Sequence, residues 1–211
     1  MAINMGYFVT RRLRSWMNRR RQLTNEKSAA DWNQEYLGGQ WEFLSKWEEM
    51  GRYWIIAGYC ALLSRPSVLD IGCGTGLLEE KLRLVPYSSY TGVDISETAL
   101  RKARSRIPPA CQLICTDFLN SCLRKKYDII VFNEVFLPGM RAVEILEKYF
   151  KFLSQGGRIV LCAFDGRNHK AREPFWKEIR QHLNVEDCSR IEHLESHKRW
   201  TIALIAPHSD L

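Results

Sequence analysis

The sequence lacks the features that would place it in a membrane, in an oxidising compartment or around a metal ion. Its longest nearly unbroken apolar run, Tyr53 to Leu63, is too short to cross a bilayer. The seven cysteines form no Cys-x-x-Cys pair and have no histidine at metal-ligand spacing, which indicates buried, reduced thiols and predicts no metal site. The first residues show neither the apolar stretch nor the cleavage site of a secretory signal. We therefore expect a cytoplasmic protein, and 211 residues leave room for one core.

The net positive charge of the chain is concentrated at its start. Residues 1–27 contain seven arginines and lysines against one glutamate, so they carry +6 of the formal net charge of +7. Apolar side chains recur there at helical spacing, at Met5, Val9, Leu13, Trp16 and Met17. The pattern predicts a basic amphipathic arm over residues 1–30. Its residues 5–23 would suit an anionic membrane surface, a polyanion or an acidic partner, or would simply be solvated.

Aromatic residues dominate the next stretch, residues 31–66. The rings recur at helical spacings, which favours helices packed over a sheet edge or a pocket. Gly38-Gly39 breaks the stretch into two segments. We therefore expect an aromatic-rich helical cap on the domain that follows, residues 67–211.

After Pro66 the chain alternates between β-branched runs and helical segments, which is typical of βαβ units and a parallel sheet. The predicted strands are Val68–Ile71, Tyr90–Ile95, Gln112–Thr116, Ile129–Asn133, Arg158–Phe164, Ser189–Leu194 and Trp200–Ala206. The predicted helices are Leu77–Leu84, Thr98–Arg106, Ala142–Leu153 and Glu173–Leu183. Ser96 is the expected N-cap of the second helix, and Gly156-Gly157 the expected end of the third. The pattern predicts a doubly wound, mostly parallel α/β domain that ends in a hairpin.

Between the first strand and the first helix, the chain turns through Gly72, Gly74 and Gly76. Side chains there would block both the tight turn and a ligand lying against the backbone. The spacing is Gly-x-Gly-x-Gly rather than the Gly-x-Gly-x-x-Gly of dinucleotide sites, and no Gly-Lys-Ser/Thr of a P-loop follows. Asp70, at the strand end, would repel a phosphate at this turn. The loop therefore favours a cationic ligand over a phosphate-bearing one.

Polar residues follow the next three strands at the same edge of the predicted sheet. Asp94 ends the second strand, where a carboxylate can accept hydrogen bonds from both hydroxyls of a ribose. Asp117 and Phe118 follow the third strand and suit the amino group and ring face of an adenine. Asn133 and Glu134 follow the fourth. Because open α/β sheets bind ligands at the carboxyl ends of their strands, we expect these side chains to share one site.

With these four features in order, the stretch from Ser67 to about Phe164 resembles the class I S-adenosylmethionine-dependent methyltransferase family. The family's glycine motif, D-x-G-x-G-x-G, matches Asp70 to Gly76 without gaps. The resemblance implies a seven-stranded sheet of order 3-2-1-4-5-7-6 with the last strand antiparallel, an N-terminal helical extension and S-adenosylmethionine as methyl donor. The expected cofactor-binding residues are Asp70, Gly72, Cys73, Gly74, Thr75, Gly76, Asp94, Ile95, Asp117, Phe118 and Asn133.

Catalytic residues are harder to predict, because methyl transfer from a sulfonium mainly requires that the enzyme position the nucleophile and exclude water. An acceptor that must lose a proton also needs a general base. Glu134, at the mouth of the fourth strand, and His169, in the loop after the fifth, are the candidates. Each could instead bind cofactor or solvent.

The acceptor class is narrowed by exclusion. Family members that methylate amino groups of nucleic acids usually carry N/D-P-P-Y/F after the fourth strand, but here the chain runs Asn133-Glu-Val-Phe136. Residues 28–211 are nearly neutral, which also disfavours nucleic acid. We therefore predict a small-molecule acceptor methylated at oxygen or nitrogen, with a membrane surface in play through the basic arm. Two alternatives stay open: an RNA or protein methyltransferase recruited by the arm, and a non-catalytic cofactor-binding partner subunit.

Overall fold

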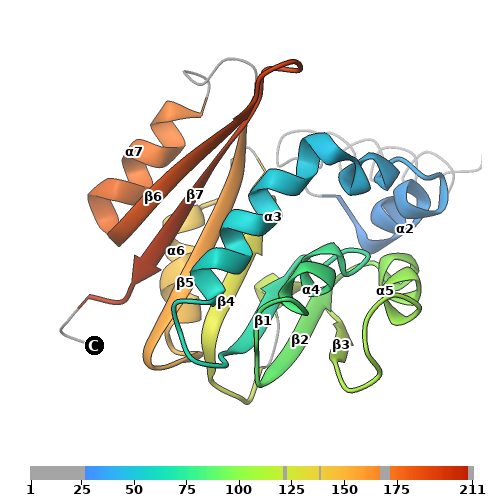
Figure 1. Ribbon diagram of the computed structural model, residues 1–211, viewed down its shortest axis with the longest axis horizontal. Coiled ribbons are helices and arrows are strands. Elements are labelled where there is room, and N and C mark those ends of the chain that lie inside the picture. The colour runs from blue at the N-terminus through green and yellow to red at the C-terminus, as the bar shows by residue number, and fades with distance from the viewer. Residues whose placement is uncertain (1–26, 121–122, 138, 167–171, 209–211) are drawn as a thin grey trace, which may run out of the picture.

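The computed structural model describes residues 27–120, 123–137, 139–166 and 172–208 of the chain (Figure 1). The basic arm predicted over residues 1–30 therefore lies almost entirely outside the described residues, and so does His169. Seven strands form one sheet: β1 (Ser67–Ile71), β2 (Ser89–Asp94), β3 (Gln112–Cys115), β4 (Tyr127–Asn133), β5 (Leu153–Gly166), β6 (Asn184–His193) and β7 (Lys198–Ala206).

The sheet has the order β3-β2-β1-β4-β5-β7-β6. The first five strands pair in parallel, and β7 runs antiparallel to both β5 and β6. This confirms the fold class, the strand order and the antiparallel last strand expected from the sequence. The carboxyl ends of β1, β2, β3 and β4 meet at one edge, as the candidate site requires.

Helices cover both faces of the sheet: α2 (Ala29–Leu37), α3 (Trp47–Cys60), α4 (Leu77–Leu82), α5 (Glu97–Arg104), α6 (Ala142–Phe150) and α7 (Glu173–His182), with short 3-10 turns η1 (Glu42–Ser45) and η2 (Phe118–Asn120). Alternate residues of each central strand face opposite layers. In β4, Ile130 and Phe132 pack with α6 and α7, whereas Ile129 and Val131 pack with α3 and α4. Burial on both faces explains why these strands read as almost continuous apolar runs.

Several element ends differ from the sequence prediction by one to five residues, and the end of α6 has a clear physical cause. Helix α6 ends at Phe150 rather than Leu153, and Gly156-Gly157 lie inside β5 instead of ending the helix. A Cβ on Gly157 would lie 3.0 Å from the carbonyl oxygen of Asp128, at the point where the register between β4 and β5 shifts. Gly157 is thus needed for a close strand approach, whereas Gly156 has left-handed backbone with φ of 75° and open space around it. These tertiary requirements resemble a helix C-cap in sequence. Ser96, by contrast, is the predicted N-cap of α5 and accepts a hydrogen bond from the N–H of Ala99.

Within the described residues, helices α2 and α3 precede β1 and are tied to different parts of the sheet domain. Helix α2 ends at the predicted break at Gly38, and its Asn33 accepts hydrogen bonds from the Ser96 hydroxyl and the Thr98 N–H at the start of α5. Helix α3 crosses in front of the strands in Figure 1, and a Cβ on its Gly51 would lie 2.2 Å from Ile191 of β6. These attachments hold the aromatic segment over the carboxyl edge of the sheet. Within the described ranges, no helix is long and apolar enough to span a membrane.

Candidate functional site

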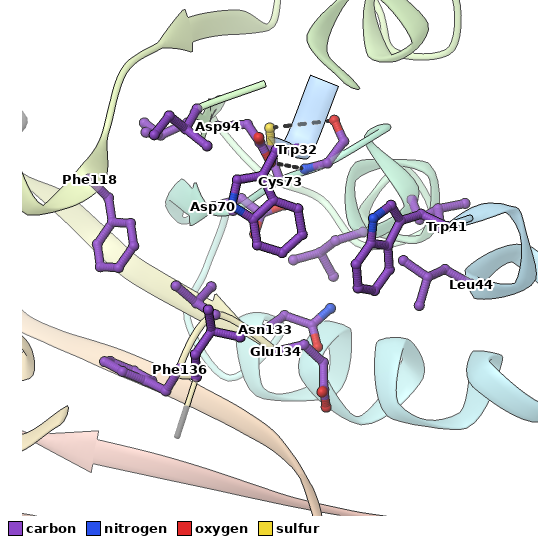
Figure 2. A pocket seen from close by; sticks show the side chains of 18 of the residues that line it. Trp32, Trp41, Leu44, Asp70, Cys73, Asp94, Phe118, Asn133, Glu134 and Phe136 are labelled. Atoms are coloured by element: carbon purple, nitrogen blue, oxygen red, sulfur yellow. Dashed lines mark hydrogen bonds between the residues drawn. The ribbon is translucent and has the colours of Figure 1, made fainter. Parts of the chain in front are cut away.

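A cavity of about 940 Å³ lies where the strand ends meet the helices that precede β1 (Figure 2). Its walls come from the carboxyl ends of β1, β2 and β4, and from the aromatic segment between Trp32 and Tyr53. Of the sequence-predicted site residues that the structure describes, it brings together all except Gly76: Asp70, Gly72, Cys73, Gly74, Thr75, Asp94, Ile95, Asp117, Phe118, Asn133 and Glu134.

The glycine loop has left-handed backbone at all three glycines, with φ of 67° at Gly72, 53° at Gly74 and 78° at Gly76. Residues with a Cβ rarely adopt this conformation. A Cβ on Gly74 would also lie 2.8 Å from the hydroxyl of Tyr36, and one on Gly76 would lie 2.6 Å from Cγ2 of Ile107. Gly76 does not line the cavity, so its requirement is the turn into α4 and close packing rather than ligand contact.

Asp94 connects the glycine loop to the end of β2. Its Oδ2 accepts a hydrogen bond of 2.9 Å from the N–H of Gly74, and its Oδ1 accepts one of 2.8 Å from the N–H of Ser96. The residue is only 8% exposed. Burial raises the pKa of the carboxyl above its usual range, and the two backbone donors oppose that shift. The carboxylate therefore fixes the loop while it lines the cavity.

Asp70 lies deeper, at the end of β1, and is 2% exposed. Its Oδ2 accepts a hydrogen bond of 2.7 Å from the hydroxyl of Tyr90. Burial raises the pKa of Asp70 to about 7; the bond from Tyr90 opposes the shift, and the charge of Asp94 adds to it. A cation bound in the cavity would therefore stabilise the ionised form of this carboxyl.

The buried carboxyl predicts a pH dependence of folding. Because the pKa of Asp70 rises from 3.8 to about 7 on folding, the unfolded chain loses this proton at lower pH than the folded one. The contribution of Asp70 to the free energy of unfolding should then fall by about 1.4 kcal/mol per pH unit as pH rises from ~5 to ~7. Asp70→Asn should make the pH dependence of the free energy of unfolding shallower by that amount, as measured by urea unfolding at several pH values. Equal slopes in wild type and Asp70→Asn would contradict this assignment.

Glu134 follows the last residue of β4 and has an unusual backbone for a residue with a side chain, with φ of 63°. Its N–H donates to the carbonyl oxygen of Cys162 at 3.0 Å. The side chain is exposed to the cavity, yet protein surrounds that space. This burial raises the pKa of Glu134 to about 7, and the guanidinium groups of Arg52 and Arg172 oppose the shift. Strained backbone and a pKa near neutrality together mark a functional position.

Several cavity residues were missed by the sequence analysis. Arg52 of α3 is 1% exposed; it forms an ion pair with Glu49, and its guanidinium carbon lies 5.1 Å from the Trp200 ring centroid. Tyr36 and Arg172 also line the cavity. The only sequence signal for Arg52 is a lone arginine at the start of an apolar helical run, and Arg172 gives none, because their positions depend on how α3 and α7 pack.

Asn133 leaves an acceptor without a partner. Its Oδ1 is buried and receives no hydrogen bond within the described parts of the chain. A buried acceptor left unpaired costs about 1–3 kcal/mol, and a bound donor would remove that cost. Figure 2 shows Asn133 beside Glu134, below the strand-end acids Asp70 and Asp94.

Comparison with known proteins identifies the family. The family model described as "Methyltransferase domain" matches residues 63–203. A malonyl-[acyl-carrier protein] O-methyltransferase of Acetivibrio thermocellus is 35% identical over 126 residues, covering 59% of this chain and 44% of that protein. The equivalent protein of Priestia megaterium is 26% identical over 121 residues, covering 56% and 44%. The chain spans about half the length of the curated relatives it matches.

Solved structures share the fold at low sequence identity. The N-methyltransferase NodS from Bradyrhizobium japonicum, in complex with S-adenosyl-L-homocysteine, superimposes with a TM-score of 0.68 at 18% identity, covering 80% of this chain and 92% of that one. The plantazolicin methyltransferase BpumL gives a TM-score of 0.59 at 19% identity, covering 83% and 91%. Since the family model spans well over half of the sequence and both strand order and glycine loop agree with it, the chain belongs to the methyltransferase domain family.

Proposed function

We propose that the protein transfers a methyl group from S-adenosylmethionine to a small-molecule acceptor, at oxygen or nitrogen. The observation that carries the proposal is the acidic end of the cavity, where Asp70 and Asp94 flank a left-handed glycine loop. A phosphate would be repelled there, whereas a ligand with a sulfonium and an ammonium would be attracted. The family membership and the named methyltransferase relatives support the same activity.

The residues of this end fit the parts of the cofactor. Gly72 and Gly74 present backbone without side chains, and the Asp94 carboxylate offers acceptors for ribose hydroxyls. Asp117 and Phe118 offer an acceptor and a ring face to adenine. The proposed set is completed by Asp70, Cys73, Thr75, Ile95 and Asn133, whose amide oxygen has no partner within the described residues. The bound cofactor supplies an activated methyl group on its sulfonium.

The chain's own residues would then position the acceptor, exclude water and move a proton. Glu134 is the proposed base: its carboxylate takes the proton that an O–H or N–H acceptor loses. The rings of Trp32 and Trp41 line the cavity. Arg52 lines the cavity as a buried cation whose charge is balanced by Glu49. His169 lies outside the described residues and stays a second candidate from the sequence.

Several observations favour a small acceptor. Curated relatives are named malonyl-[acyl-carrier protein] O-methyltransferases, and one structural neighbour is an N-methyltransferase. Residues 28–211 carry almost no net charge, which disfavours a polyanion track. A cytoplasmic location, and contact of residues 5–23 with a membrane surface or an acidic partner, remain proposals from the sequence alone.

Two measurements test the proposed function. The full chain should bind S-adenosyl-L-homocysteine with micromolar affinity in titration calorimetry. Incubation with methyl-labelled S-adenosylmethionine and a cell extract should then place label in the small-molecule fraction. Label in RNA or protein would favour the macromolecular alternative, and turnover only with a co-purifying partner would favour a cofactor-binding subunit. Absence of binding by either cofactor form would overturn the proposal.

A further inference from the structure

The charged side chains that line the cavity are five acids and four cations. Asp70, Asp94 and Asp117 lie at the strand ends around the glycine loop, whereas Glu49 belongs to α3 and Glu134 follows β4. The cations are Lys27 before α2, Arg52 of α3, Arg172 at the start of α7 and Lys198 at the start of β7. The three strand-end acids fit a cationic methyl donor, so a cation that has no acidic partner is left for the acceptor.

Three of the four cations are already neutralised. Lys27 Nζ lies 2.7 Å from Oε1 of Glu35. Arg52 forms a buried ion pair with Glu49 of the same helix. Lys198 Nζ lies 2.7 Å from Oε2 of Glu48 and 2.9 Å from Oε1 of Glu49, which connects α3 to β7. These pairs leave little net charge for a ligand.

Arg172 differs because no acidic side chain of the described ranges lies within ion-pair distance of it. Its Nη2 donates to the carbonyl oxygen of Phe136 at 2.9 Å, and its guanidinium carbon lies 4.7 Å from the ring centroid of Phe175. Its Nε is buried without a hydrogen-bond partner. A half-buried guanidinium that lacks a counter-ion is costly, and an anionic ligand would remove that cost.

The position of Arg172 is next to the reacting end of the site. Its charge acts on Glu134, the proposed base, as does the charge of Arg52. The nearby cavity wall is apolar, formed by Phe136, Phe164 and Trp200. A ligand group held by Arg172 would therefore place the rest of the molecule between aromatic rings and beside the Glu134 carboxylate.

We propose that the acceptor carries a carboxylate, which pairs with Arg172 and orients the acceptor toward Glu134. One unmatched positive charge suits one negative charge, so a carboxylate fits better than a phosphate monoester, which carries about two at pH 7. The inference deepens the proposed function and rests on it, because it assigns the acceptor half of the same cavity.

The test uses the full chain saturated with S-adenosyl-L-homocysteine and two probes of equal shape, benzoate and the neutral benzamide. Benzoate should bind at least tenfold more tightly than benzamide in calorimetry. Arg172→Gln should abolish that preference and leave the affinity for S-adenosyl-L-homocysteine within twofold. Arg172→Lys should keep part of the preference, since the charge remains. Arg180→Gln, an exposed arginine of the same helix that pairs with Glu173, should change neither affinity.

Each failure has a separate meaning. Equal binding of the two probes to the wild-type complex, or a preference that survives in Arg172→Gln, overturns the carboxylate site and leaves the methyltransferase proposal standing. A tenfold loss of S-adenosyl-L-homocysteine affinity in Arg172→Gln also overturns it, because Arg172 would then hold the cofactor's own carboxylate. If the wild-type chain binds no S-adenosyl-L-homocysteine, the proposed function and this inference both fail.

Discussion

Asp94→Ala is expected to weaken the binding of S-adenosyl-L-homocysteine about 100-fold, or by about 2.7 kcal/mol in binding free energy. The substitution removes the proposed ribose acceptor, and it also removes the two hydrogen bonds that hold Gly74 and Ser96. Bonds to a charged group contribute about 1.5–3 kcal/mol each, so the glycine loop should lose its bound-state geometry as well as a ligand contact. Titration calorimetry on the purified full chain measures the effect.

Two further variants separate a local effect from unfolding. Asp187→Ala makes the same exchange on β6, where the carboxylate accepts a bond from Tyr59, and should leave cofactor affinity unchanged. Asp94→Asn keeps one acceptor oxygen and should fall between wild type and Asp94→Ala. All three should retain cooperative thermal unfolding. Wild-type affinity in Asp94→Ala would remove this residue from the cofactor site.

Glu134→Gln should lower turnover by about 100-fold or more, because a positioned general base contributes on the order of 10²–10⁴ to the rate. The substitution keeps the size of the side chain and removes only its ability to take a proton. The affinity for S-adenosyl-L-homocysteine should therefore stay within a few-fold of wild type. Initial rates with the acceptor identified from the extract provide the measurement, and Glu144→Gln on the exposed face of α6 serves as the control.

The pH profile distinguishes a base from a merely structural carboxylate. The pKa of Glu134 is raised to about 7, so the proton-accepting form is depleted below that pH. Wild-type turnover should fall about tenfold per pH unit below ~7 and level off above it, whereas Glu134→Gln should show no such step. If Glu134→Gln retains full turnover, the acceptor reacts without a protein base.

The sheet could be predicted because its information is local. Strands such as β4 are buried on both faces and therefore appear in the sequence as apolar runs. The polar residues that follow these runs mark the strand ends to within a few residues. The glycine pair at 156–157 was misassigned because a helix end demands the same residue type as the left-handed backbone of Gly156 and the close strand approach at Gly157. Only the register between β4 and β5, which the sequence does not reveal, distinguishes a helix end from a strand at these glycines.

Only the part of the site formed by the strand ends could be predicted from the sequence. Residues after consecutive parallel strands must meet at one edge, so Asp70, Asp94 and Asn133 converge as expected. Arg52 and Arg172 reach the cavity because α3 and α7 pack against the sheet in a particular way. The spacing of residues in these helices does not indicate that either arginine faces a cavity. The donor half therefore follows from strand order, and the acceptor half follows from tertiary contacts.

The left-handed backbone of Glu134 implies a trade-off between stability and activity. A residue with a Cβ at φ of 63° costs about 1–2 kcal/mol relative to its relaxed backbone, a cost that glycine would avoid. The same position also withdraws a carboxylate from bulk water. The chain thus holds an ionisable side chain where both backbone and solvation oppose it. Substitutions of Glu134 that stabilise the fold should therefore be those that remove the proposed proton acceptor.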